Sequence, residues 1–137
     1  MDREEFLKQL GTAALLTCTG CGLFACSSDD QDPAPSGVDF ILDLTLSSNA
    51  ALNTPGGSVS ANGIIVARVS AAEFTALSRA CTHAGTPVNY RSAQQDFLCP
   101  NHGSIFNKSG AVLLGPANSP LRKYNTELTG NSLRVFS

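Results

Sequence analysis

The sequence is poor in charged residues and in histidine. Lys, Arg, Asp and Glu make up 15% of its 137 residues, and only two residues are histidine. The net charge of −2 excludes a protein that binds nucleic acid through a strongly basic surface. Lys and Glu are scarce while Gly, Ser, Thr, Asn and Val are plentiful, which favours strands and turns over helices. The length suits one domain and is too short for two ordinary ones.

Catalytic groups are equally scarce. Both histidines stand beside cysteines, so no third histidine is left to activate a serine or threonine as a nucleophile. Glu73, Asp96 and Glu127 each stand alone, which favours solvated or structural acids over general bases. From Gly57 onward seven Lys and Arg residues accompany these three acids, and they are scattered along the sequence. The sequence therefore predicts no catalytic residue of its own.

No apolar run is long enough to cross a membrane as a helix. The uncharged segment 10–25 has sixteen residues, short of the ~20 required, and is typical of a signal-peptide core. Leu23-Phe24-Ala25-Cys26 is similar to the site at which lipoproteins are cleaved and lipidated, with Cys21 as the rival cysteine. We therefore expect a signal peptide over 1–25, with cleavage before Cys26 and lipidation of Cys26. The alternatives are a plain secretory peptide or an uncleaved anchor.

The leader carries two further signals. Residues 3–8 resemble a twin-arginine export signal, although Glu4 occupies the position of the second arginine. Cys18 and Cys21 form C-x-x-C, but both lie inside the apolar segment, so we expect them to be removed with it. The polar, Pro-rich residues 26–37 are typical of a flexible tether.

Beyond the tether, short apolar runs alternate with turn residues. Strands are predicted at 38–47, 64–70, 73–80, 111–115 and 121–128, the last forming a hairpin with 132–137. Closely spaced strands without a long amphipathic helix predict an all-β fold, a small antiparallel sandwich or barrel over 38–137.

Four potential metal ligands occur in two short motifs. Cys81 and His83 are one residue apart, and Cys99 and His102 are two residues apart. The intervening segment is long enough for a hairpin that brings the motifs together. Sulfur and imidazole donors suit zinc, copper or iron–sulfur clusters. A Cys81–Cys99 disulfide would leave the placement of both histidines unexplained, and a Cys2His2 zinc site is the second alternative.

The two motifs resemble those of the Rieske [2Fe–2S] family. Cys81-Thr82-His83-Ala84-Gly85 matches its first box, and 99–104, CPNHGS, matches its second. Gly115-Pro116-Ala117 matches a family loop that covers the cluster. The resemblance spans roughly 57–137 and implies a Rieske-type sandwich or barrel, with a loop-borne cluster-binding part at about 80–117.

The resemblance also implies residue roles. Cys81 and Cys99 would hold the inner iron of one [2Fe–2S] cluster, and His83 and His102 the outer iron. Gly85 and Gly103 would permit tight turns that aim backbone N–H groups at the sulfurs. Ser104 would donate a hydrogen bond to a bridging sulfide, and Pro116 belongs to the covering loop.

Three positions depart from the quinol-oxidising members of the family. Thr86 and Asn101 replace the cysteines of a disulfide that clamps the two loops. Phe106 replaces a tyrosine whose hydroxyl donates to a ligand sulfur. Fewer hydrogen bonds to sulfur predict a midpoint potential in the middle or lower part of the roughly −150 to +300 mV range.

The resemblance implies one-electron transfer by an exported carrier or small redox subunit of a respiratory or periplasmic oxidoreductase. Its partners would be redox proteins, such as a membrane complex or quinol-linked donor, and not nucleic acid. A lipid anchor would hold it at the periplasmic side or surface of a bacterial membrane. The alternatives are the ferredoxin component of a Rieske-type oxygenase and a structural zinc-binding lipoprotein.

Overall fold

A computed structural model describes residues 34–137. The predicted signal peptide, the cleavage before Cys26 and most of the tether at 26–37 lie outside the described residues, and so does the C-x-x-C of Cys18 and Cys21. Within the described range, no helix is long and apolar enough to cross a membrane.

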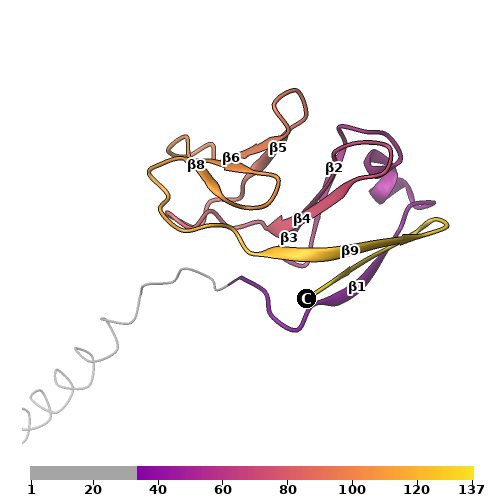
Figure 1. The fold of residues 1–137 in the computed structure, drawn as a ribbon. Helices are drawn as coiled ribbons and strands as arrows, with labels where there is room; N and C mark the ends of the chain where they lie inside the picture. The colour runs from indigo at the N-terminus through magenta and orange to yellow at the C-terminus, as the bar shows by residue number, and fades with distance from the viewer. Residues whose placement is uncertain (1–33) are drawn as a thin grey trace, which may run out of the picture. The chain divides into compact units, whose positions relative to one another are not determined.

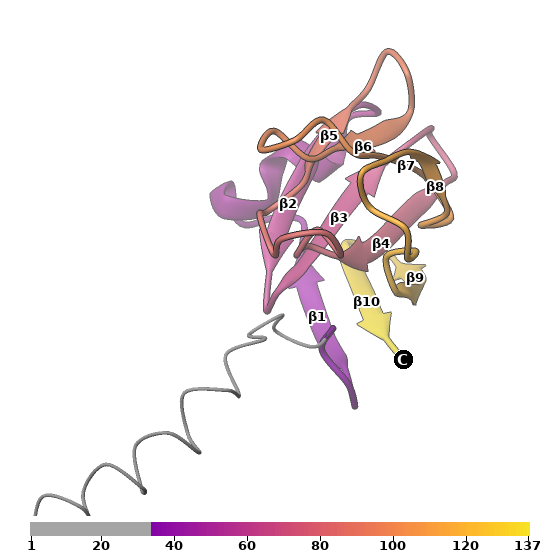
Figure 2. The same ribbon diagram turned by 90° about the vertical axis from the view of Figure 1, so that its left-hand side faces the viewer.

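The described chain forms two antiparallel sheets (Figures 1 and 2). The larger sheet has the strand order β1-β10-β9-β4-β3-β2, and the smaller has the order β5-β6-β7-β8. The elements are β1 (Asp39–Asp43), a 3₁₀ helix η1 (Ser47–Asn53), β2 (Ser58–Ala61), β3 (Ile64–Arg68), β4 (Phe74–Ser78), β5 (Asn89–Arg91), β6 (Asp96–Leu98), β7 (Ile105–Asn107), β8 (Val112–Leu114), β9 (Lys123–Thr129) and β10 (Ser132–Phe136).

The first four residues of strand β3 are all apolar and buried, so both faces of the strand lie in the core. Side chains alternate between the faces of a strand, so Ile64 and Val66 enter one apolar cluster and Ile65 and Ala67 enter the other. The second cluster joins the larger sheet to the smaller one and contains both Cys81 and Cys99. Burial of the two cysteines thus depends on the same strand as the core of the larger sheet.

The segment that carries both motifs is inserted between two neighbouring strands. Strands β4 and β9 pair directly, although the chain between them runs from Arg79 to Arg122. The backbone N–H of Ser78 donates to the carbonyl of Arg122 at 2.8 Å, and the N–H of Arg122 donates to Ser78 Oγ at 3.0 Å. The inserted segment, which includes the expected cluster-binding part at 80–117, therefore leaves and returns at one place.

The all-β prediction is confirmed, as is the hairpin of β9 and β10. The expected hairpin between the motifs is also present as β5 and β6, which an ion pair of Arg91 with Asp96 closes, with two N–O distances of 2.7 Å. The sequence did not predict η1, β2 or β7, whereas β8 lies within the strand predicted at 111–115. The three missed segments are too short or too polar for an apolar periodicity to be read.

Candidate metal centre

The two motifs form turns with the same hydrogen-bond pattern. In each, the cysteine N–H donates to the carbonyl five residues later, and the N–H of a glycine four residues later donates to the cysteine carbonyl. The bonds are Cys81 to Thr86 at 2.9 Å, Gly85 to Cys81 at 2.7 Å, Cys99 to Ser104 at 2.8 Å and Gly103 to Cys99 at 3.0 Å. This shared geometry explains why a histidine two or three residues after each cysteine reaches the same place.

Each turn requires its glycine for conformational reasons. Gly85 has φ +74° and Gly103 has φ +81°, in the left-handed region that other residues seldom adopt. A Cβ at either position would meet no protein atom within 4 Å. The expected N–H groups that face sulfur are not those of the glycines, which donate to carbonyls. At Cys81 they belong to His83 and Ala84.

The two cysteines are buried as neighbouring free thiols. Cys81 is 2% exposed and Cys99 is fully buried, and neither forms a disulfide. Burial raises the pKa of the Cys81 thiol, the adjacent Cys99 raises it further, and the backbone N–H groups of His83 and Ala84 act in the opposite direction. The turns thus place two potential thiolate ligands side by side beneath the surface.

The two histidines form a second donor pair at the surface. Both are exposed, and their Nδ1 atoms lie 3.1 Å apart, with the rings nearly perpendicular at 83°. Two imidazole nitrogens that each lie about 2.1 Å from one metal ion are separated by about 3.0–3.4 Å. The Nδ1 atoms therefore already face each other at the separation that a shared metal ion requires.

The four donors are arranged as a sulfur pair and a nitrogen pair. Within residues 34–137, no group of three or more His, Cys, Asp or Glu residues is placed to hold one metal ion. A binuclear cluster with two sulfur ligands on one iron and two nitrogen ligands on the other matches this pairwise arrangement. The side chains present are thus suited to a [2Fe–2S] cluster.

A third loop ties the two turns together. The Ala117 N–H donates to Ser104 Oγ at 3.0 Å, and Thr82 Oγ1 donates to the Ser119 carbonyl at 2.6 Å. Ala117 is 4% exposed and packs in the cysteine-containing core, whereas Pro116 is exposed. The sequence indicated this loop, but neither cross-loop bond could be found from it, because their partners are far apart in the chain.

The Ser104 hydroxyl can both accept and donate a hydrogen bond. Its hydroxyl is fully buried and accepts the Ala117 hydrogen bond. A serine hydroxyl also has one hydrogen to donate. Phe106, two residues later, is likewise fully buried in the cluster of apolar side chains that contains Cys81 and Cys99.

Comparisons with known proteins agree with this geometry. The family model of the Rieske [2Fe–2S] domain matches residues 45–125. The cytochrome b6-f complex iron–sulfur subunit of Chlorobaculum thiosulfatiphilum is 36% identical over 62 residues, which cover 45% of this chain and 34% of that protein. The chain thus matches about a third of the length of this relative.

Two solved structures share the fold. The plasma membrane Rieske protein PetC3 from Synechocystis PCC 6803 is 32% identical, with a TM-score of 0.52 over 59% of this chain and 85% of that one. A chain from the complex of reduced oxygenase and oxidised ferredoxin in carbazole 1,9a-dioxygenase is 26% identical, with a TM-score of 0.52 over 63% and 86%. With its paired donors and a family match over more than half its length, the chain belongs to the Rieske [2Fe–2S] domain family, whose members hold a single [2Fe–2S] cluster.

Proposed function

We propose that this protein is a one-electron carrier, an exported and membrane-tethered redox subunit that works with a respiratory or periplasmic oxidoreductase. The proposal rests on the arrangement of four donor side chains: two adjacent buried thiols, and two surface imidazoles whose Nδ1 atoms lie 3.1 Å apart. The cluster would supply a reversible single-electron couple.

In this proposal Cys81 and Cys99 hold the inner iron, and His83 and His102 the outer iron. The ligands then run from the apolar core to the surface, which puts the imidazoles where a partner can approach. Ser104, already oriented by Ala117, would donate its hydroxyl hydrogen to a sulfide. The Thr82 and Ser104 bonds to the third loop would hold both turns fixed during electron transfer.

The similarity to b6-f iron–sulfur subunits and to a plasma membrane Rieske protein supports a membrane-linked role. Lipidation at the lipoprotein-like residues 23–26 would tether the protein to a membrane. Fractionation of cells that express the full chain tests this part. We expect the protein in the membrane fraction, and the Cys26→Ser variant in a soluble exported fraction; cytoplasmic wild-type protein would contradict the proposal.

The redox centre is tested by absorption and electron paramagnetic resonance spectra of the reduced full-length protein, together with iron and sulfide analysis. We expect two iron and two sulfide per chain and one unpaired electron after reduction. A colourless protein that contains one zinc would support the structural zinc alternative instead.

The buried phenyl ring of Phe106 provides a prediction about the potential. We expect Phe106→Tyr to raise the midpoint, because a new hydroxyl near the cysteines would donate to sulfur and stabilise the reduced, more negative state. A hydrogen bond worth ~1 kcal/mol corresponds to a rise of about 40 mV for one electron.

Redox titration measures this shift, and Phe97→Tyr is the matched control. Phe97 is equally buried but its ring packs on Tyr90, with centroids 5.1 Å apart. Equal shifts in both variants, or none in either, would mean that the Phe106 ring does not face a ligand sulfur.

The second candidate is the ferredoxin component of a Rieske-type oxygenase. The absence of clamp cysteines at Thr86 and Asn101, and the likeness to the dioxygenase complex structure, favour it. A cytoplasmic location together with electron delivery to a Rieske oxygenase would select this candidate over the membrane-tethered carrier.

A further inference from the structure

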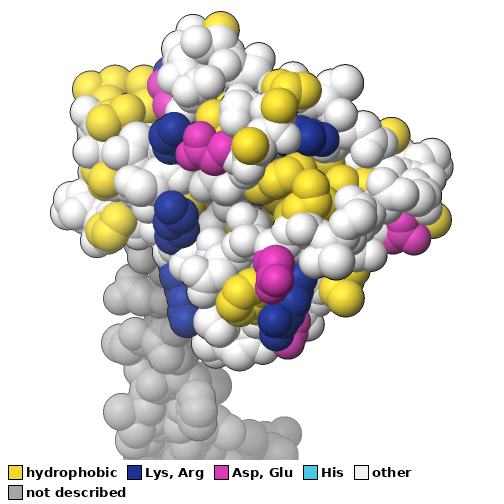
Figure 3. All heavy atoms as spheres, turned by 45° about the vertical axis from the view of Figure 1, so that its right-hand side comes forward, with side chains coloured by type: hydrophobic (Ala, Val, Ile, Leu, Met, Phe, Trp, Pro, Cys, Tyr) yellow, Lys and Arg dark blue, Asp and Glu magenta, His cyan; other side chains and the backbone are white. Residues whose placement is uncertain are grey.

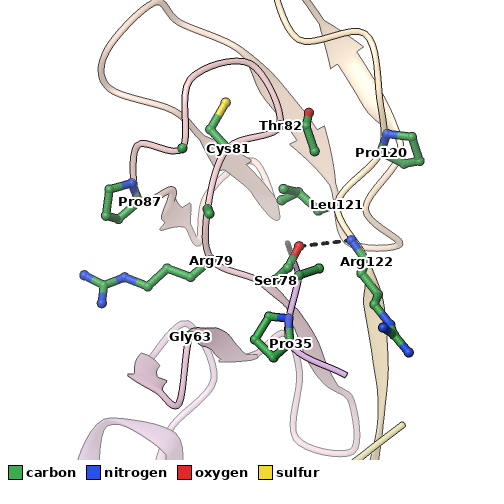
Figure 4. A pocket seen from close by; sticks show the side chains of 13 residues that line it. Pro35, Gly63, Ser78, Arg79, Cys81, Thr82, Pro87, Pro120, Leu121 and Arg122 are labelled. Carbon is green, nitrogen blue, oxygen red and sulfur yellow. Dashed lines mark hydrogen bonds between the residues drawn. The ribbon is translucent and has the colours of Figure 1, made fainter. Parts of the chain in front are cut away.

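A groove of about 650 Å³ runs beside the first cysteine turn (Figure 4). Its walls come from the start of the described chain, the segment after β4 and the segment before β9, and they are mainly apolar through Pro35, Pro87, Pro120 and Leu121. Arg79 and Arg122 lie on opposite sides of it in Figure 4. No aspartate or glutamate is among its lining residues.

The groove is where unpaired positive charge gathers on the described chain. Of the seven Lys and Arg residues in 34–137, three form ion pairs with acids: Arg91 with Asp96, Lys108 with Glu73 and Arg134 with Asp39. Arg68 instead donates to the backbone carbonyls of four residues, Leu52, Asn53, Ser70 and Ala71.

The remaining cations are Arg79, Arg122 and Lys123, and within residues 34–137 none of them has an acidic partner. Arg79 and Arg122 line the groove, and Lys123 is the next residue along the chain. Arg122 also stacks over Tyr124, with 5.5 Å to the ring centroid, which restricts its side chain. Elsewhere the charges are mixed: on the face in Figure 3, acidic side chains lie beside several basic ones. Although the basic residues are scattered in the sequence, the fold therefore places Arg79, Arg122 and Lys123 in or next to the groove.

The groove also reaches the metal centre. Cys81, Thr82 and Gly85 form part of its wall, so an occupant would touch the turn that carries one of the buried thiols. It would approach from the side of this turn, where the wall residues include neither histidine.

We propose that this groove docks an acidic segment of a redox partner protein, with carboxylates at Arg79 and Arg122 and an apolar side chain between them. This inference rests on the proposed electron-transfer function and adds the partner's chemistry and position. Guanidinium groups bind carboxylates through paired hydrogen bonds. The prolines have fixed φ angles, so the walls lose little entropy on binding. One electron leaves the cluster and enters the partner's redox group, and no covalent bond changes.

The test measures the second-order rate at which the reduced, full-length protein reduces two c-type cytochromes of similar size and potential, one acidic and one basic. The charge variant is Arg79→Gln with Arg122→Gln. The matched control, Lys108→Gln with Arg134→Gln, changes the net charge equally but lies outside the groove. A third variant, Ala34→Trp, fills the groove without changing charge.

At low ionic strength we expect the charge variant to reduce the acidic cytochrome about tenfold more slowly than wild type, and the control less than twofold more slowly. Ala34→Trp should slow this reaction at every ionic strength. The basic cytochrome should not distinguish the charge variant from its control. Spectra and midpoints should stay unchanged throughout.

Three outcomes would overturn the inference. Equal slowing in the charge variant and its control would indicate net charge alone, and no slowing would place docking elsewhere. Slowing of the reaction by inorganic phosphate at constant ionic strength, together with an unchanged rate in Ala34→Trp, would indicate that the groove binds small anions and not a partner segment. Failure of the wild type to reduce either cytochrome would instead count against the proposed function.

Discussion

Replacing Cys99 by alanine is expected to remove all bound iron and sulfide and the visible colour of the protein. Cys99 is fully buried beside Cys81, and the two thiols form the inner half of the proposed ligand set. No other cysteine lies within the described residues, so no sulfur there can take its place. Metal analysis and absorption spectra of the purified variant measure the loss.

The thermal stability of the same variant distinguishes a bound cluster from a disulfide. Cysteine packs as a small apolar residue, so the cavity itself costs little, on the order of 1–2 kcal/mol. Most of the destabilisation should come from the missing cluster, because metal binding is coupled to folding. The Tm of Cys99→Ala should therefore lie only about 5–10 °C below that of iron-free wild type, while Cys26→Ser keeps its iron. If the Tm of the wild type did not change on iron removal but fell when a thiol reductant was added, a Cys81–Cys99 disulfide would be indicated instead.

Gly110→Ala is expected to give a large loss of stability, although it leaves the four proposed ligands intact. Gly110 lies in the turn between β7 and β8 with φ +91°, and its carbonyl accepts a 2.8 Å hydrogen bond from the Leu121 N–H. An added Cβ would lie 2.3 Å from the Leu121 carbonyl oxygen. The variant would combine backbone strain with a clash against backbone, which cannot rotate away.

We expect Gly110→Ala to lower the Tm by more than ~10 °C, because strain and clash together should cost about 3 kcal/mol or more. Thermal unfolding followed by circular dichroism measures this. Gly130→Ala is the control, since Gly130 has φ +59° but a Cβ there would meet nothing within 4 Å. Gly130→Ala should lose only the roughly 1–2 kcal/mol of stability that a left-handed backbone conformation costs alanine. Similar Tm values would refute the importance of the contact with Leu121.

Contacts around the metal centre differ in how far they could be predicted. The tight turns are local features, and the positions of Gly85 and Gly103 already indicated them. The bonds from Thr82 to Ser119 and from Ala117 to Ser104 join residues 37 and 13 positions apart. Which distant polar groups meet depends on how the inserted segment folds back, and no local pattern encodes that.

The sequence by itself determined the types and spacing of the proposed ligands and the β-rich class of the fold, because these depend on side-chain chemistry and on short-range backbone preferences. The tertiary structure decided how the thiols are buried together beneath exposed imidazoles, since both cysteines pack in one apolar cluster with residues of both sheets. It alone decided which cations lack acidic partners. Ion pairing between residues such as Arg134 and Asp39, 95 positions apart, is set by strand register, and it leaves Arg79 and Arg122 as the unpaired charges of the groove.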